Sequence, residues 1–115
     1  MKAKLVLGAS SVASGVLLLA VACSLTLPVH GQTEAGDETF SGSATGYLDR
    51  SGTMTIQSNR GITCAGEFVY VNAREGQGTF RCSDGRSGPF TFVSTGLHGT
   101  GTGRLGDRRF TFTFG

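Results

Sequence analysis

The chain has few of the residues that enzymes and nucleic-acid-binding proteins rely on. Its only lysines are Lys2 and Lys4, and beyond them eight arginines stand against eight acidic residues. The formal charge of +2 therefore belongs to the first four residues. A basic surface is not indicated, so we expect no nucleic-acid partner.

Histidine is also scarce, which argues against catalysis. The two histidines are His30, in a polar segment, and His98, in an expected turn. A hydrolase-like set of Ser94, His98 and Asp107 stays open, but a lone loop histidine is more often simply solvated. Metal sites need clustered ligands. We therefore expect a non-enzymatic protein with no metal site and no cofactor.

No helical period follows the N-terminal segment, and short alternating runs separated by turn residues fill the rest of the chain. Such a pattern is typical of an all-β sandwich or barrel. Sequential short hairpins favour an antiparallel up-and-down meander of about seven strands, curled into a small barrel. With seven strands, closure requires a parallel contact, an eighth strand from the preceding segment, or a gap. The expected strands are 39–47, 53–58, 62–71, 76–82, 88–94, 99–105 and 109–114.

Two cysteines, Cys64 and Cys82, face each other if a hairpin turns around Ala73. Directly opposed strand residues come close enough for a disulfide, and a one-residue slip would destroy the arrangement. The same register lays an aromatic ring over a glycine at every inward position. These pairs are Gly66 with Phe80, Phe68 with Gly78 and Tyr70 with Gly76.

The other turns predict further registers of the same kind. A three-residue loop at 59–61 places Met54 beside Gly66 and Ile56 beside Cys64, and turns at 96–97 and 106–107 place a central glycine strand between two phenylalanine strands. A loop centred on Gly85 would set Phe80 against Phe90 and Gly78 against Phe92. If the ends of the sheet meet, Phe110, Phe112 and Phe114 could lie over Gly42, Ala44 and Gly46.

All eight phenylalanines fall on the inward face in these registers. Small barrels are filled by such side chains, so we expect binding on the outside, at loops or a rim, rather than in a spacious cavity. The loop with Ser83, Asp84 and Arg86 is the candidate binding loop, although a turn stabilised by Asp and Gly explains it equally simply. On the outer face Thr91, Thr102 and Thr111 align across three strands, as β propensity alone would produce.

The first 22 residues have the character of an export signal. Two lysines precede an apolar run from Leu5 to Ala22. Ala20-Val21-Ala22-Cys23 resembles the lipobox of bacterial lipoproteins, in which the cysteine is lipidated and becomes the mature N-terminus. Cleavage without lipid, or a retained membrane helix, are the alternatives. In such lipoproteins Ser24 at the next position implies sorting to the outer membrane.

The resulting organisation has three parts: a signal peptide at 1–22, a flexible polar tether at 23–38, and a β-barrel-like domain at 39–115. The residues 78–96 and 101–115, with the run CSDGRSGPF, resemble a group of small Gly/Thr-rich envelope lipoproteins of Gram-negative bacteria of uncharacterised function. A weaker similarity, in size, lipobox, disulfide and all-β character, is to membrane-bound C-type lysozyme inhibitors. The resemblance implies a lipid-anchored envelope protein at the outer membrane.

The expected function is accordingly a non-enzymatic binding or structural module of the envelope. Its partners would be the membrane, through the N-terminal lipid, and an envelope protein or glycan. The alternative is an inhibitor-like protein that binds an envelope hydrolase.

Overall fold

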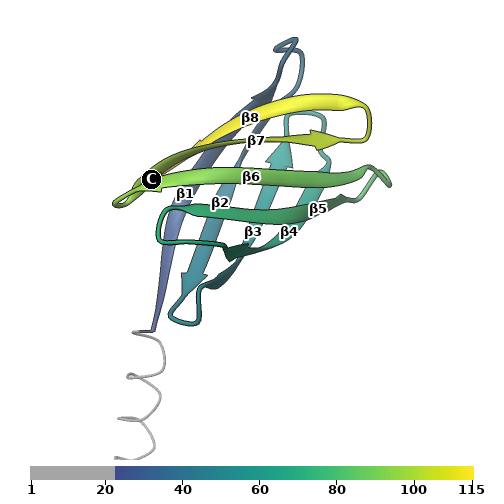
Figure 1. Cartoon of the computed structure of the whole chain (residues 1–115). Coiled ribbons are helices and arrows are strands. Elements are labelled where there is room, and N and C mark those ends of the chain that lie inside the picture. The colour runs from purple at the N-terminus through teal and green to yellow at the C-terminus, as the bar shows by residue number, and fades with distance from the viewer. Residues whose placement is uncertain (1–22) are drawn as a thin grey trace, which may run out of the picture.

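The computed structural model describes residues 23–115, which form a closed antiparallel β-barrel of eight strands (Figure 1). Each strand pairs with the next, and the last pairs with the first. Within 23–115, no helix has the length and apolar character to cross a membrane. The expected signal peptide at 1–22 lies outside the described residues. The strands are β1 (Ser24–Thr33), β2 (Thr39–Tyr47), β3 (Ser51–Ser58), β4 (Thr63–Tyr70), β5 (Glu75–Cys82), β6 (Ser87–Thr95), β7 (His98–Leu105) and β8 (Arg108–Phe114).

Strand β1 corrects the expected tether at 23–38 and the count of seven strands. It pairs antiparallel with β2 along nearly its whole length and with β8 along its second half. Eight strands let the first and last run in opposite directions, so the barrel closes by ordinary antiparallel pairing and its central strands have no exposed edge. The expected contact of β8 with β2 is therefore wrong. Phe110, Phe112 and Phe114 lie opposite Thr33, Gly31 and Val29.

Most of the predicted hairpin registers are confirmed. Cys64 lies opposite Cys82 and forms the disulfide, and the three predicted aromatic–glycine pairs between β4 and β5 are in register. The Phe80 ring covers its partner Gly66 as predicted, whereas the rings that cover Gly78 and Gly76 are those of Phe90 and Phe92. The registers of β3 with β4, β6 with β7 and β7 with β8 are also as expected. Short turns determine these registers locally, which is why the sequence alone predicts them.

The register between β5 and β6 differs from the predicted one by two residues. Phe90 lies opposite Gly78 and Phe92 opposite Gly76, rather than opposite Phe80 and Gly78. The loop is Ser83-Asp84-Gly85, closed by a hydrogen bond from the Cys82 amide to the Arg86 carbonyl. Gly85 has a positive φ of 91°, so it takes the last position of a three-residue loop, where a left-handed residue is required. The corrected register extends the ring-over-glycine pattern to β6.

The core is built from all eight phenylalanines, as predicted, and each is at least nine-tenths buried. Their rings cover the inward faces of glycines on neighbouring strands. A Cβ atom built on Gly101 would lie 2.2 Å from Cζ of Phe112, and one on Gly76 would lie 2.1 Å from Cζ of Phe92. Neither distance leaves room for any side chain, so the glycines in these strands supply volume for the rings.

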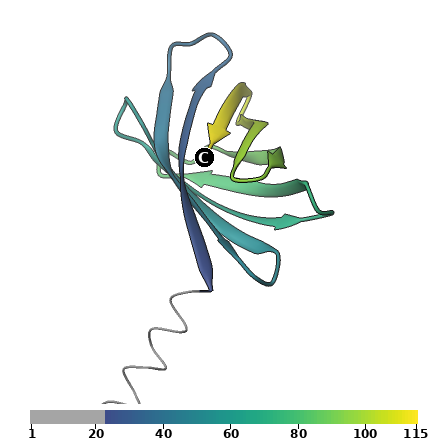
Figure 2. The same cartoon turned by 90° about the vertical axis from the view of Figure 1, so that its left-hand side faces the viewer.

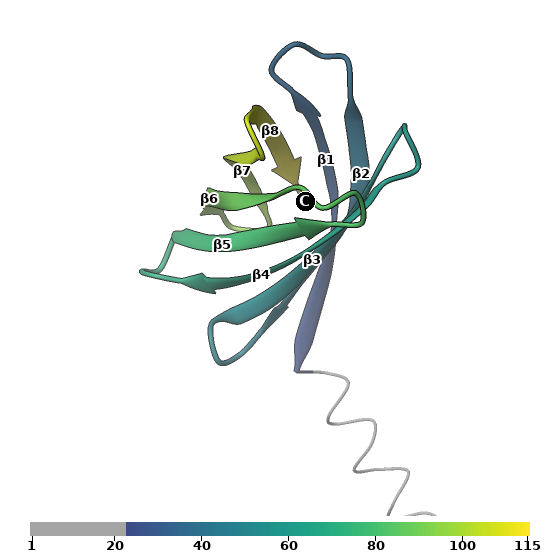
Figure 3. The ribbon, with the colours of Figure 1, turned by 90° about the vertical axis from the view of Figure 1, so that its right-hand side faces the viewer.

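The turns alternate between two ends of the barrel. One end, here called the mouth, holds Cys23, the turns 48–50, 71–74 and 96–97, and Gly115. The other, called the sealed end, holds the turns 34–38, 59–62, 83–86 and 106–107. Figure 2 and Figure 3 show the start of β1 and the β2–β3 turn projecting together from the barrel on the mouth side.

Substitution of Gly101 by valine should destabilise the barrel, although valine is the better strand former, because its side chain would occupy the volume of the Phe112 ring. Overpacking of this kind costs about 1 to 3 kcal/mol. Thr102→Val, on the exposed outer face of the same strand, should be nearly neutral. Denaturant unfolding of both variants measures the difference, and equal free energies of unfolding would contradict the ring-over-glycine core.

Candidate functional site

The sealed end is closed by an ion pair inside the barrel. The Glu38 side chain is completely buried, and both of its oxygens accept hydrogen bonds from the Arg86 guanidinium, each at 2.9 Å. Arg86 also donates from Nε to Asp84 Oδ2 at 2.7 Å. A buried carboxylate needs such bidentate pairing to offset its desolvation. The hydrogen bonds from Arg86 hold the pKa of Glu38 below its ordinary value despite burial.

A second carboxylate, Asp37, joins three segments around this end. It accepts hydrogen bonds from the Thr33 hydroxyl at 2.8 Å and from Arg60 at 3.2 Å, and it pairs with Arg108. The hydrogen bond from Thr33, followed by that from Arg108, lowers the pKa of Asp37 to about 2. The result is a polar lid that connects β1, the β3–β4 turn and β8.

The candidate binding loop has its polar groups directed into this lid. Arg86 is about four-fifths buried and bonds to both Glu38 and Asp84. The Ser83 hydroxyl accepts a hydrogen bond from the Thr63 amide at 3.1 Å. Asp84 accepts from the Arg86 amide as well as from its side chain. The structure therefore assigns these three residues a role in the turn and in sealing the barrel.

The hydrolase-like set is not assembled. His98 begins β7 at the mouth, whereas Asp107 lies in the turn after β7 at the sealed end. The Ser94 hydroxyl shares a hydrogen bond of 2.8 Å with the Tyr70 hydroxyl. No group of three or more potential metal ligands occurs among residues 23–115.

The mouth holds a cavity of about 340 Å³ that opens to the outside and is lined mainly by apolar groups. None of the described residues that line it is charged. Its walls come from the start of β1, the end of β2, and inward residues of β3, β4, β6 and β8. The lining residues are Cys23, Ser24, Leu25, Leu27, Ala44, Gly46, Tyr47, Leu48, Met54, Phe68, Tyr70, Phe92, Gly96, Leu97 and Phe114.

The cavity exists because the ring-over-glycine pattern stops at Gly46. Its neighbours across the two adjacent strands are Leu25 and Gly52, so no phenylalanine stands beside it. A Cβ atom built on Gly46 meets nothing within 4 Å, whereas one on Gly52 would lie 2.2 Å from the Phe68 ring. Gly46 and the small Ala44 next to it on the inward face therefore leave open space where the rest of the barrel is filled.

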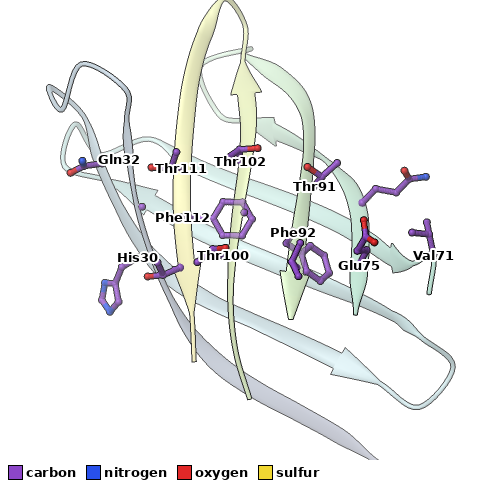
Figure 4. Close-up of a pocket in the computed structure, with 16 residues that line it drawn as sticks. His30, Gln32, Val71, Glu75, Thr91, Phe92, Thr100, Thr102, Thr111 and Phe112 are labelled. Carbon is purple, nitrogen blue, oxygen red and sulfur yellow. The ribbon is translucent and has the colours of Figure 1, made fainter. Parts of the chain in front are cut away.

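Among the larger surface concavities is a broad outer groove of about 680 Å³ (Figure 4). It runs over β5, β6, β7, β8 and β1, and Figure 4 shows Thr91, Thr102 and Thr111 side by side on three of these strands. The threonine alignment predicted from the sequence is thus confirmed. The groove lies on the outer face of the sheet and its lining includes His30, Glu75 and several threonines, whereas the mouth cavity reaches inward residues and has no charged lining residue. We therefore regard the mouth cavity as the better site for an apolar ligand.

Sequence reasoning missed both features of the interior. Glu38 is a single carboxylate at the end of a polar segment and gives no local sign that it is buried against a residue 48 positions away. Sequence reasoning missed the cavity because its lining includes Leu25 and Leu27, which lie in the segment that the sequence predicts to be a tether. A signal was available: their alternation with polar residues fits one face of a strand.

No protein-family model and no curated protein matches the sequence. Two solved structures resemble the fold, and both are designed proteins. The first is a de novo designed fluorescence-activating β-barrel (TM-score 0.60, 16% identity). The match covers 77% of this chain and 88% of the designed chain. The second is a redesigned β-barrel, mFAP1, bound to DFHBI (TM-score 0.60, 13% identity). The match covers 77% of this chain and 90% of that chain. At these identities the likeness shows the fold alone.

Removal of the buried charge should destabilise the barrel in a pH-dependent way. Glu38→Gln leaves Arg86 without its bidentate partner inside the barrel, and breaking a buried pair costs on the order of 3 kcal/mol. Folding lowers the pKa of Glu38, so the stabilisation from its pair with Arg86 is present above the ordinary pKa of 4.5 and is lost as the pH falls below that value. Asp37, whose pKa is lowered to about 2, adds a pH-dependent stabilisation of its own in both proteins.

Unfolding by denaturant between pH 7 and pH 2 tests this linkage, with pH values chosen to span both pKa shifts. The parent chain should lose stability steeply below the ordinary pKa of Glu38, and Glu38→Gln should show a shallower loss. Parallel curves for the two proteins would contradict the assigned role of Glu38.

Proposed function

We propose that this protein is a non-enzymatic, lipid-anchored envelope lipoprotein whose barrel binds a small neutral apolar ligand in the mouth cavity. The observation that carries the ligand site is the open space over Gly46 in a barrel whose other inward glycines are mostly covered. The volume falls at the lower end of the range for small-molecule sites, which is about 300 to 1,000 Å³. An eight-stranded barrel is also the size that can hold one small ligand.

The chemistry of the lining defines the ligand class. Leucine, methionine and aromatic side chains surround the cavity, and without a charged lining residue a ligand ion would lose its hydration with no compensation. Tyr70 lines the cavity, and its hydroxyl, which shares a hydrogen bond with Ser94, is one polar group that could orient a ligand. The redesigned barrel mFAP1, which has a similar fold, is bound to the small molecule DFHBI. At this low identity no binding residue can be carried over to this chain. The likeness supports only the point that a barrel of this fold can hold a small molecule.

The envelope location rests on the N-terminal residues. The charged and apolar leader, followed by small residues and Cys23, supports export and lipidation, and Ser24 supports sorting to the outer membrane. The disulfide between Cys64 and Cys82 fits an oxidising compartment outside the cytoplasm. The inhibitor-like alternative receives no comparable support, because that similarity is limited to size, lipobox, disulfide and all-β character, and no lysine follows Lys4.

Filling the cavity should abolish ligand binding without harming the fold. In Gly46→Leu the new side chain enters open space, so the free energy of unfolding should stay close to that of the parent. Binding of the neutral fluorescent probe N-phenyl-1-naphthylamine should weaken by about tenfold or more, which corresponds to ~1.4 kcal/mol. The matched control is Ser43→Leu, on the outward face of the same strand, which should bind the probe as the parent does.

A fluorescence titration measures both affinities. Equal probe binding by Gly46→Leu and the parent, or no saturable binding by the parent, would refute the cavity as the ligand site.

Lipidation should depend on Cys23. Mass spectrometry of the N-terminus should find an acylated Cys23, and Cys23→Ser should move the protein out of the membrane fraction or stall its processing. The control Cys64→Ser/Cys82→Ser removes the disulfide but should leave the protein in the membrane fraction. An unmodified N-terminus, or an intact Met1 on the mature chain, would refute the lipid anchor.

A further inference from the structure

We propose that the mouth of the barrel is a membrane-docking surface, with its apolar rim resting in the lipid leaflet that anchors the chain. The proposal rests on the anchoring proposed above and goes beyond it, because an anchor alone does not determine which face of the barrel meets the membrane.

The first argument is the distance from the anchor to the fold. The barrel begins at Ser24, the residue after Cys23, and Ser24 is already paired with Tyr47 on β2. No tether separates the barrel from the point where the chain reaches the membrane. This holds whether Cys23 carries a lipid or the apolar segment at 5–22 is retained, because both place the bilayer at the mouth.

The second argument is the distribution of exposed apolar side chains. Those described by the structure as large, apolar and exposed all lie at or near the mouth. Leu48 is 82% exposed and Leu97 is 58% exposed, and both stand at the tips of mouth turns, with Val71 on a third. Leu25 and Tyr47 lie on the projecting pair of β1 and β2.

The two remaining exposed apolar residues, Val69 and Val93, lie on the outer face close to the mouth ends of β4 and β6. The sealed end has the opposite character, because Asp37, Arg60 and Arg108 form its exposed ion-pair cluster. Clustered apolar residues at one end of a soluble fold mark an interaction surface. A lipid leaflet, apolar at depth and present at Cys23, is the partner that matches this position.

Docking also determines which environment the mouth cavity opens into. Leu25, Leu48 and Leu97 belong both to the rim and to the lining of the mouth cavity. With the rim in the leaflet, the cavity opens towards hydrocarbon, and an apolar ligand can enter or leave without crossing water.

The chain has no tryptophan, so a single introduced tryptophan reports its own surroundings. We would introduce Leu48→Trp and Leu97→Trp at the rim and Asp107→Trp at the sealed end as the matched control. All three positions are exposed, so the fold should tolerate the new side chain. Each full chain is purified from membranes and reconstituted into vesicles of phosphatidylethanolamine and phosphatidylglycerol, with or without acyl-chain-brominated lipid.

Flotation with the vesicles tests the anchor, and tryptophan emission tests docking. Both rim variants should emit at shorter wavelength than Asp107→Trp and be quenched severalfold more strongly by brominated lipid. If all three variants float but the rim variants are quenched no more than the control, docking is refuted and the anchor stands. If none floats, the anchoring is refuted and the docking with it.

Discussion

The packing of phenylalanine rings over cross-strand glycines is the constraint on which the rest of the barrel depends. A ring needs the volume that a neighbouring side chain would occupy, and glycine supplies it, as the pairs Phe112 with Gly101 and Phe92 with Gly76 show. Because inward residues alternate along every strand, one such pair sets the register for a whole hairpin. The same packing fills the barrel and leaves a cavity where a strand glycine has neither a ring nor any other group within 4 Å of its missing side chain. Gly46 is that place, and the apolar mouth follows from it.

The two ends of the barrel differ in how they are closed. At the sealed end, polar turns meet over the core, and the buried Glu38 is satisfied by both nitrogens of the Arg86 fork while Asp37 connects neighbouring segments. At the mouth, the start of β1 extends past the end of β8, since β8 pairs with β1 only from Val29 onwards. The rings therefore do not close over this end, and leucines form its rim. The mouth turns also carry Asp49, Arg50 and Arg74, but the exposed large apolar side chains of residues 23–115 all lie towards this end, which gives the barrel a direction.

This direction fits the proposed anchoring. A tether would have let the barrel turn freely above the membrane, and its apolar end would then have needed another explanation. In the proposed anchoring, a first strand that begins beside Cys23 would instead keep the mouth at the membrane. The ligand proposal and the docking proposal share this geometry, but they rest on different residues: Gly46 and Ala44 inside the cavity, and Leu48 and Leu97 at the rim.

The sequence by itself determined the all-β class, the disulfide, the burial of every phenylalanine and most hairpin registers. These follow from turns of two or three residues and from alternation, which are local. One register was misjudged by placing Gly85 in the middle of its loop rather than at its left-handed last position. Tertiary structure alone decided the rest. β1, which contains Pro28, pairs with β2 along 24–32 and closes the barrel by pairing with β8 at the far end of the chain. Likewise, Glu38 is buried by Arg86, and the cavity depends on which residues β1 and β3 bring beside Gly46. Contacts between residues far apart in sequence appear only once the barrel has closed.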